Sequence, residues 1–138
     1  MGNSKLLQDK RIYVVEDNSD NIYILLTILR MHGANVEVDW WAKGESQKIL
    51  KALPIDIILL DLMLPDKRTG FDVFQEIHAL PELAAVPIVA VSAADASVAV
   101  PKARTMGFAG FIKKPVDDDL FPQQLKTILE GKPVWFFD

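Results

Sequence analysis

The sequence predicts a doubly wound α/β fold, in which a parallel sheet carries helices on both faces. Short runs of Val, Ile and Leu alternate with longer segments whose apolar residues recur at helical spacing, in five successive pairs. The strand segments are unbroken apolar runs, which is typical of parallel strands covered on both sides. We therefore expect a five-stranded parallel sheet with the strand order 2-1-3-4-5.

The first two pairs of elements fall within residues 11–53. RIYVVED (11–17) predicts a strand, and DNIYILLTILRMHG (20–33) predicts a helix that ends at Gly33. The expected apolar face of this helix contains Ile22, Leu25, Leu26 and Leu29. NVEVDWWA (35–42) predicts the second strand, and GESQKILKAL (44–53) predicts a short helix that Pro54 ends.

Three more pairs follow. IDIILLD (55–61) predicts a strand, and FDVFQEIHAL (71–80) a helix; PIVAVSA (87–93) and GFIKKP (110–115) predict the last two strands. Between these two strands lies ADASVAVPKARTMG (94–107), where either a helix begins near Pro101 or the chain bends there. DDDLFPQQLKTILEG (117–131) predicts a closing helix, with three acids where the helix dipole favours them and Pro122 in the first turn.

Length and composition indicate one ordinary globular domain. The chain has 138 residues, of which 50% are hydrophobic and 25% charged. There is no internal repeat, low-complexity stretch or linker-like segment. We expect a single domain over residues 1–138, with a core at about 11–129 and terminal extensions at 1–10 and 131–138.

Charge and cysteine content exclude several classes of function. A net charge of −4 supplies no basic stripe for nucleic acid, so no direct nucleic-acid binding is expected. The absence of cysteine excludes disulfides and thiolate metal sites and fits a reducing compartment, so we expect a cytoplasmic location. The apolar runs are too short for a membrane span, and no membrane contact is expected.

Polar side chains end four of the predicted strands. Because parallel strands all point the same way, the residues at their carboxyl ends meet at one edge of the sheet. Ligands bind at this edge where the strand order reverses, which here is between strands one and three. The polar residues at the carboxyl ends of the four strands are Glu16, Asp17, Asp61, Ser92, Lys113 and Lys114. The acidic ones follow strands one and three.

This constellation predicts a magnesium-dependent phosphoryl site. Two carboxylates 4 Å apart repel by about 4 kcal/mol at an effective dielectric of 20, and a divalent cation removes the conflict. A donor set made only of oxygens favours Mg²⁺. Lys114 and Ser92 then form a cradle for a phosphoryl group on Asp61. No nucleotide-binding glycine loop is present, so the phosphoryl group is expected to come from another protein or a small phosphodonor.

Four motifs in this order resemble the receiver domain of two-component response regulators. They are VVEDN after strand one, LLDLMLP after strand three, VSA after strand four and KKP after strand five. The resemblance covers residues 11–129. It implies a flavodoxin-like fold and a stand-alone signalling switch that is not a turnover enzyme.

The resemblance also implies the roles of individual residues. Asp61 would accept a phosphoryl group from a phosphohistidine of a sensor histidine kinase or histidine phosphotransfer protein. Glu16, Asp17, Asp61 and the backbone carbonyl of Met63 would hold Mg²⁺, and Lys114 and Ser92 would bind the phosphoryl oxygens. Movement of Ser92 and an inward turn of Phe111 would then reshape the face of helix four, strand five and helix five, where a downstream protein target binds.

Three features depart from the family pattern. Gly70 follows Asp61 by nine residues where the family usually has eight, so the loop PDKRTG is one residue longer. Phe111 replaces the more common Tyr and lacks a hydroxyl to anchor an outward ring. Pro101 makes the fourth helix unusual, so the partner that binds there cannot be inferred.

Two other functions remain open. One is a receiver-like interaction domain that is never phosphorylated. The other is a Mg²⁺-dependent aspartyl phosphatase of the haloacid dehalogenase type, although such enzymes carry a second Asp where this chain has Met63.

The remaining polar and aromatic candidates have simpler interpretations. Lys113 is expected to be solvated, and His32 and His78 to be structural or solvated. Trp40 and Trp41 lie at the end of the second predicted strand. The tail VWFFD (134–138) either docks a partner, including a second copy in a homodimer, or folds back on its own domain.

Overall fold

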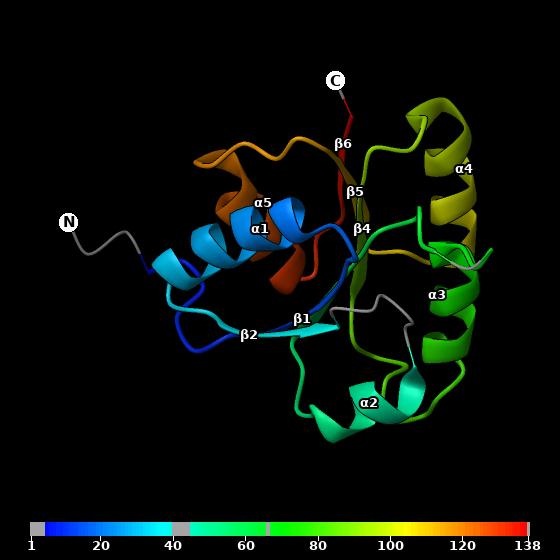
Figure 1. Ribbon diagram of the computed structural model, residues 1–138, viewed down its shortest axis with the longest axis horizontal. Helices are drawn as coiled ribbons and strands as arrows, with labels where there is room; N and C mark the ends of the chain where they lie inside the picture. Colours follow the sequence, from blue (N-terminus) through cyan, green and yellow to red (C-terminus); the bar gives the residue numbers. More distant parts are fainter. Residues whose placement is uncertain (1–4, 40–44, 66, 138) are drawn as a thin grey trace.

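The computed structural model describes residues 5–39, 45–65 and 67–137. All strands of its sheet are parallel, in the order β2-β1-β3-β4-β5-β6 (Figure 1). They are β1 (Arg11–Val15), β2 (Asn35–Asp39), β3 (Ile57–Leu60), β4 (Ile88–Ser92), β5 (Gly110–Lys113) and β6 (Val134–Phe136). The predicted order of the first five strands is confirmed.

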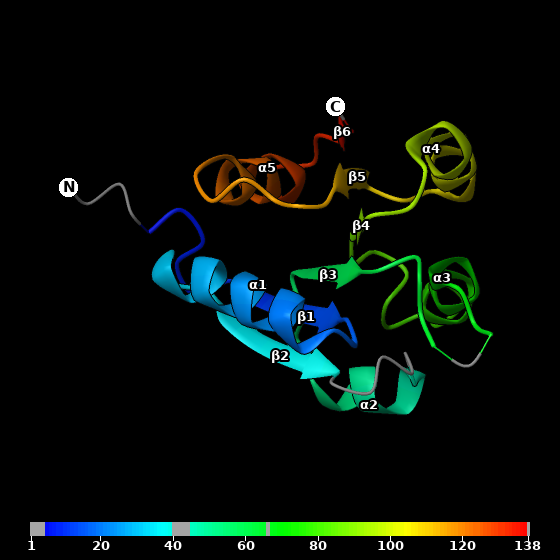
Figure 2. The same cartoon turned by 45° about the horizontal axis from the view of Figure 1, so that its top comes forward.

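Helices cover both faces of the sheet. They are α1 (Ser19–Met31), α2 (Ser46–Lys51), α3 (Gly70–His78), α4 (Ala96–Met106) and α5 (Leu120–Leu129). Figure 2 shows α1 and α5 on one face and α2, α3 and α4 on the other, which confirms the doubly wound class. None of these helices in the described part of the chain is long and apolar enough to cross a lipid bilayer.

The sheet separates two hydrophobic clusters. Tyr13, Ile58 and Leu60 face the cluster shared with α2, α3 and α4, whereas Val14 and Leu59 face the cluster shared with α1 and α5. Alternate residues of one strand therefore enter opposite clusters, as the pleat requires. Residues before β1 also take part, since Leu7 is fully buried in the second cluster and its N–H donates to the carbonyl of His32.

The ends of α1 follow the predicted signals. The side chain of Asn18 accepts a hydrogen bond from the N–H of Asn21 and caps the start of the helix. At the other end, Gly33 follows the C-cap residue His32. Gly33 has a φ of +88°, a value that favours glycine. The buried face differs in one residue, because Ile28 is buried and Leu26 is only half-buried.

The predicted alternative in which the fourth helix begins near Pro101 is wrong. The helix begins at Ala96, and the side chain of Asp95 caps it by accepting from the N–H of Ser97. Pro101 therefore lies inside the helix, which costs roughly 3 kcal/mol in a helix interior. The cap and the burial of Ala99, Val100 and Ala103 against the sheet offset this cost. Pro122 lies in the first turn of α5, as predicted.

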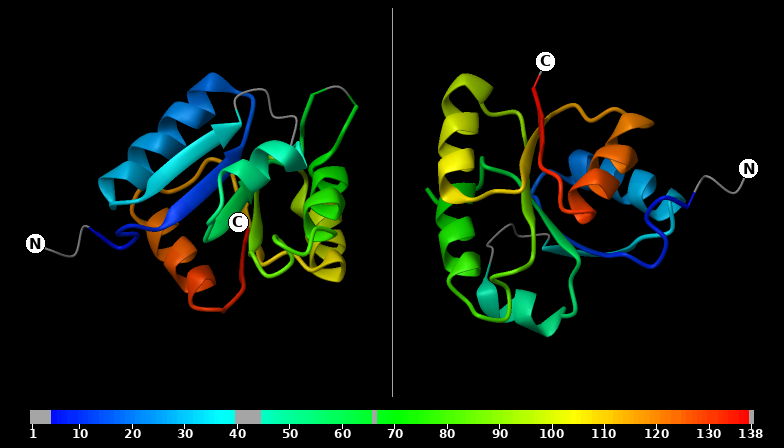
Figure 3. Two further views of the ribbon diagram at one scale, coloured as in Figure 1. Left: turned by 90° about the horizontal axis from the view of Figure 1, so that it is seen from below. Right: turned by 180° about the vertical axis from the view of Figure 1, so that it is seen from behind.

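The prediction of five strands missed β6. Val134, Trp135 and Phe136 pair with Gly110, Phe111 and Ile112 of β5 and extend the sheet by one strand. Figure 3 shows the C-terminal segment running beside β5. The tail therefore folds back on its own domain, which was one of the two alternatives. A three-residue strand has no recognisable period, so only its contacts with β5 define it.

Trp135 and Phe136 lie on opposite sides of the sheet. Trp135 packs against the α2–α4 cluster, and the guanidinium of Arg104 in α4 lies 4.8 Å from the centre of its ring. Phe136 packs against the α1/α5 cluster. A side chain on Gly110 would come within 3.0 Å of the backbone of Val134, so glycine permits this close pairing. Trp40 and Trp41 lie outside the described residues.

Candidate functional site

The predicted polar residues meet at the carboxyl edge of the sheet. Glu16 directly follows β1, Asp61 follows β3, Ser92 ends β4 and Lys114 follows β5. Glu16, Asp61 and Ser92 are all buried, and Asp61 has an exposed fraction of 7%. Buried charged groups are rare unless they are paired, so their partners indicate what the site can do.

Lys114 joins the two buried carboxylates. Its Nζ donates to Oδ2 of Asp61 at 3.0 Å and also forms an ion pair with Oε1 of Glu16. The peptide bond that follows, Lys114–Pro115, is cis. Because one ammonium group faces two carboxylates, their formal charges are not balanced and one negative charge remains.

Backbone N–H groups bind the other carboxylate oxygens. The N–H of Asn18 donates to Oε2 of Glu16 at 3.2 Å, and the N–H of Met63 donates to Oδ1 of Asp61 at 3.0 Å. These bonds fix the orientation of both carboxylates. They also place the Met63 peptide directly beside Asp61.

The pKa values reflect this shortage of positive charge. Burial raises the pKa of Glu16 above its usual value, and the hydrogen bond from Lys114 opposes the change without cancelling it. Burial alone would lower the pKa of Lys114, but its hydrogen bonds and charge interactions with Glu16 and Asp61 outweigh burial and raise that pKa. Lys114 therefore stays charged at neutral pH.

Asp17 differs in burial from the other two carboxylates. It directly follows Glu16 but its side chain is exposed. Within residues 5–39, 45–65 and 67–137, no group of three or more His, Cys, Asp or Glu side chains is arranged to hold a metal ion. The complete set of magnesium ligands, including the carbonyl of Met63, stays a prediction.

Ser92 and Phe111 lie on the neighbouring strands β4 and β5. Oγ of Ser92 accepts a hydrogen bond from the N–H of Ala94 at 3.2 Å. Phe111 has an exposed fraction of 0%, and it is paired with Trp135 in the register of β5 and β6. The ring of Phe111 is thus already inward in this structure.

The end of the loop after Asp61 pairs with its start. The N–H of Gly70 donates to the carbonyl of Leu62 at 3.0 Å. Met63 and Thr69 form an isolated antiparallel β-bridge. A Cβ atom on Gly70 would lie less than 3.0 Å from the carbonyl oxygen of Asp61, so only glycine fits. Thr69 and Asp72 form a capping box that starts α3 here.

The expectation that Lys113 is solvated is incomplete, because its half-buried side chain also binds the backbone. Its Nζ donates to the carbonyl oxygens of Ala93 at 3.0 Å and Ala94 at 2.7 Å. The pairing of Lys113 with Ser92 across β5 and β4 brings this side chain to the loop after Ser92. A strand register could have predicted this contact, but the sequence alone does not give the register. His78 was predicted to be structural or solvated; it is exposed, and its ring stacks on Phe74.

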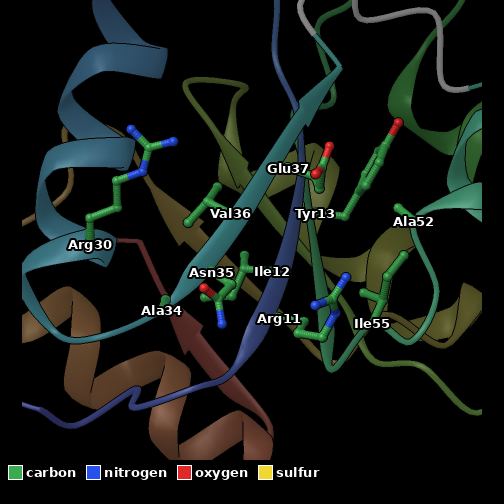
Figure 4. A pocket seen from close by; sticks show the side chains of 10 residues that line it. All are labelled: Arg11, Ile12, Tyr13, Arg30, Ala34, Asn35, Val36, Glu37, Ala52 and Ile55. Atoms are coloured by element: carbon green, nitrogen blue, oxygen red, sulfur yellow. The ribbon is translucent and has the colours of Figure 1, made fainter.

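A separate pocket of about 320 Å³ lies around the edge strand β2 (Figure 4). Arg30 and Val36 line it on the α1 side of the strand, and Tyr13 and Ala52 line it on the α2 side. The pocket extends to Asn35 at the amino end of β2, away from the carboxyl edge. Because ligands of open parallel sheets bind at the carboxyl edge, the candidate site is the one around Asp61.

Comparison with known proteins identifies the family. Residues 12–126 match the family model of the response regulator receiver domain. The chain belongs to the response regulator receiver family. The receiver domain is 24% identical to Protein PilH of Pseudomonas aeruginosa over 121 residues, covering 88% of this chain and 98% of PilH.

Other similar proteins include larger ones. The receiver domain is 26% identical over 108 residues to the signal transduction histidine-protein kinase BarA of Escherichia coli, covering 78% of this chain but only 12% of BarA. Among solved structures, the chemotaxis response regulator CheY4 of Vibrio cholerae has the same fold, with a TM-score of 0.76 and 19% identity over 88% of this chain and 99% of CheY4. The receiver domain is thus a component of two-component signal transduction.

Proposed function

We propose that this receiver domain is a phosphoacceptor switch in which Asp61 accepts a phosphoryl group from a phosphohistidine of a sensor kinase or phosphotransfer protein. The ion pairs of Lys114 with both Asp61 and Glu16 carry the proposal. They place a cation beside the acceptor, at the edge of the sheet where ligands bind. We further propose that the switch acts in the cytoplasm.

The charge and donor atoms of the site fit Mg²⁺. Two buried carboxylates share one ammonium, and burial raises the pKa of Glu16, so a further cation would stabilise the ionised site. All the donors are oxygens, which favour a hard cation. Glu16, Asp17, Asp61 and the Met63 carbonyl would hold it. When bound, the ion neutralises charge on the phosphoryl oxygens.

In the transfer, a carboxylate oxygen of Asp61 forms a bond to phosphorus while the bond from phosphorus to the donor imidazole nitrogen breaks. The leaving nitrogen keeps the electron pair. Lys114 neutralises the phosphoryl oxygens, and the hydroxyl of Ser92 donates to one of them. Water later hydrolyses the acyl phosphate and regenerates the Asp61 carboxylate.

The signal leaves through the face made by α4, β5 and α5. Phosphorylation adds about −1.5 to −2 charges at a site that is already negative. Ser92 and Phe111 would pass this change to the face, where a downstream protein binds. Because β6, which contains Trp135 and Phe136, pairs with β5, it would form part of this surface.

Incubation with acetyl phosphate and Mg²⁺ tests the proposal. Intact-protein mass spectrometry should show a gain of one phosphoryl group, which Asp61→Asn abolishes. Asp56→Asn is the matched control, because Asp56 precedes β3 and binds the N–H of Arg11 at the other end of the sheet. No gain with acetyl phosphate or with a phosphorylated phosphotransfer protein would overturn the proposal.

The same samples separate the two alternatives. Continued release of phosphate from p-nitrophenyl phosphate over many turnovers would favour an aspartyl phosphatase. Absence of both phosphorylation and turnover would leave an interaction domain.

A further inference from the structure

Lys113 connects the end of β5 to the loop between β4 and α4. Its ammonium donates to the carbonyl oxygens of Ala93 and Ala94, at 3.0 and 2.7 Å. These two residues directly follow Ser92 and lead into Asp95, which caps α4. One side chain therefore binds two successive carbonyl groups of the connection between Ser92 and the start of α4.

This connection controls the hydroxyl of Ser92. The N–H of Ala94 donates to Oγ of Ser92 at 3.2 Å, and the carbonyl of Ala93 in the same peptide group accepts from Lys113 at 3.0 Å. Lys113 also binds the next peptide group through the carbonyl of Ala94. A serine hydroxyl has one hydrogen to donate and can accept at its lone pairs. With Ala94 as the donor to Oγ, the hydrogen of Ser92 stays available for another acceptor.

The backbone of Ser92 is fixed from the same strand. Its carbonyl oxygen accepts a hydrogen bond from the N–H of Lys114 at 3.0 Å. The two adjacent lysines thus have different partners: Lys114 binds Asp61 directly, and Lys113 binds the loop whose Ala94 N–H donates to the Ser92 hydroxyl.

We propose that Lys113 is a positioning residue, which holds the loop at Ala93 and Ala94 so that the Ser92 hydroxyl can donate its hydrogen to a phosphoryl group on Asp61. This inference rests on the proposed function. It assigns a role to the lysine that does not contact the phosphoryl group. The competing explanation is that the positive charge of Lys113 attracts the anion from a distance.

A double-mutant cycle on the binding of beryllofluoride, a phosphoryl mimic, separates the two explanations. In the presence of Mg²⁺, Lys113→Met should weaken binding about fivefold, whereas Lys113→Arg, which can donate to both carbonyls, should bind nearly as the unchanged protein does. In the Ser92→Ala background, Lys113→Met should cause no further loss. An equal loss in both backgrounds, or no loss at all, would overturn the proposal. Lys126→Met, at an exposed site on α5, controls for the loss of one charge.

Amide hydrogen exchange of the free protein tests the loop without any phosphoryl group. The N–H of Ala94 should exchange faster in Lys113→Met and at the original rate in Lys113→Arg. Unchanged exchange in Lys113→Met contradicts the proposal. If the Ala94 N–H exchanges faster in Lys113→Met but the unchanged protein binds no beryllofluoride, the proposed function is contradicted. Lys113 then holds the loop, but it does not position Ser92 for a phosphoryl group.

Discussion

Nζ of Lys114 lies 3.0 Å from Oδ2 of Asp61, although 53 positions separate the two residues in the chain. The contact exists because β3 and β5 point the same way and end at the same edge of the sheet. Glu16 joins from β1 and shares the same ammonium. The carboxylate of Asp61 is therefore fixed in orientation by Lys114 at one oxygen and by the N–H of Met63 at the other.

Removal of Lys114 should raise the pKa of Glu16 further. Lys114 opposes the effect of burial on this carboxyl, so Lys114→Met leaves only the hydrogen bond from the N–H of Asn18 to oppose it. Because the pKa in the folded state then rises further above the usual 4.5, the variant should lose more stability than the unchanged protein as pH rises above that value. Carboxyl carbon NMR titration measures the pKa, and urea unfolding across pH measures the stability.

Lys132→Met provides the control for this titration, since Lys132 is exposed beyond α5. This substitution should leave the pKa of Glu16 unchanged. A Glu16 pKa that is the same in Lys114→Met and the unchanged protein would show that the ion pair does not form in solution.

Gly70→Ala should disturb the acceptor itself. The new Cβ atom would collide with the carbonyl of Asp61 and the backbone of Leu62, so the chain must shift, at a cost of about 1–3 kcal/mol. We expect a lower free energy of unfolding and slower phosphorylation by acetyl phosphate. Chemical unfolding and mass spectrometry measure the two effects.

Gly131→Ala is a matched substitution far from the site. Gly131 has a φ of +91° with no atom near the position of a Cβ, so alanine there should cost about 1 kcal/mol in stability alone. Its phosphorylation rate should stay that of the unchanged protein. Equal rates in both alanine variants would mean that the close approach at Gly70 does not matter for Asp61.

Trp135→Ala should destabilise the domain by about 1–2 kcal/mol. The half-buried ring packs on the cluster that contains Phe111 and lies beneath the guanidinium of Arg104. Phe137→Ala, at a ring that is 43% exposed beyond β6, should change stability by less than about 0.5 kcal/mol. Urea unfolding of both variants checks the difference. Equal stabilities would indicate that β6 is not docked in solution.

The capping box of α3 should make stability depend on acid pH. The hydrogen bond from the N–H of Thr69 lowers the pKa of Asp72 below its usual 3.8. Asp72 therefore contributes stability above that value, and the contribution is lost as pH falls through the lower pKa of the folded state. The unchanged protein should be more stable than Asp72→Asn near neutral pH, and the gap should close as the pH falls below 3.8 and through the lowered pKa of the folded state.

Thermal unfolding across this pH range measures the gap, with Glu82→Gln as a control at an exposed carboxyl. A gap of constant size down to the lowest pH would contradict the assigned ionisation of Asp72.

The sequence predicted the layers of the fold and the main partners at the site for one physical reason. Unbroken apolar runs identify parallel strands, and the direction of those strands brings their terminal residues together. Glu16, Asp61 and Lys114 could therefore be grouped without any coordinates. The same reasoning does not give burial, so it did not predict that Asp17 is exposed whereas Glu16 and Asp61 are buried.

Other differences arise where tertiary contacts outweigh local signals. The segment Val134–Phe136 is too short to show a strand period, and it forms a strand because β5 offers it an edge. Pro101 is a poor helix former, yet α4 continues through it because Asp95 caps the helix and its inner face is buried. Lys113 resembles a solvated lysine in the sequence, and only the register of β4 and β5 reveals its two carbonyl partners.

Chemical mapping of the phosphoryl group tests the central claim most directly. After incubation with acetyl phosphate and Mg²⁺, borohydride converts an aspartyl phosphate to homoserine, and peptide mass spectrometry locates the change. We predict homoserine at position 61 alone, with Asp17 and Asp56 unmodified. Homoserine at another aspartate, or a borohydride-resistant phosphate on Ser92, would contradict the assignment of Asp61 as the acceptor.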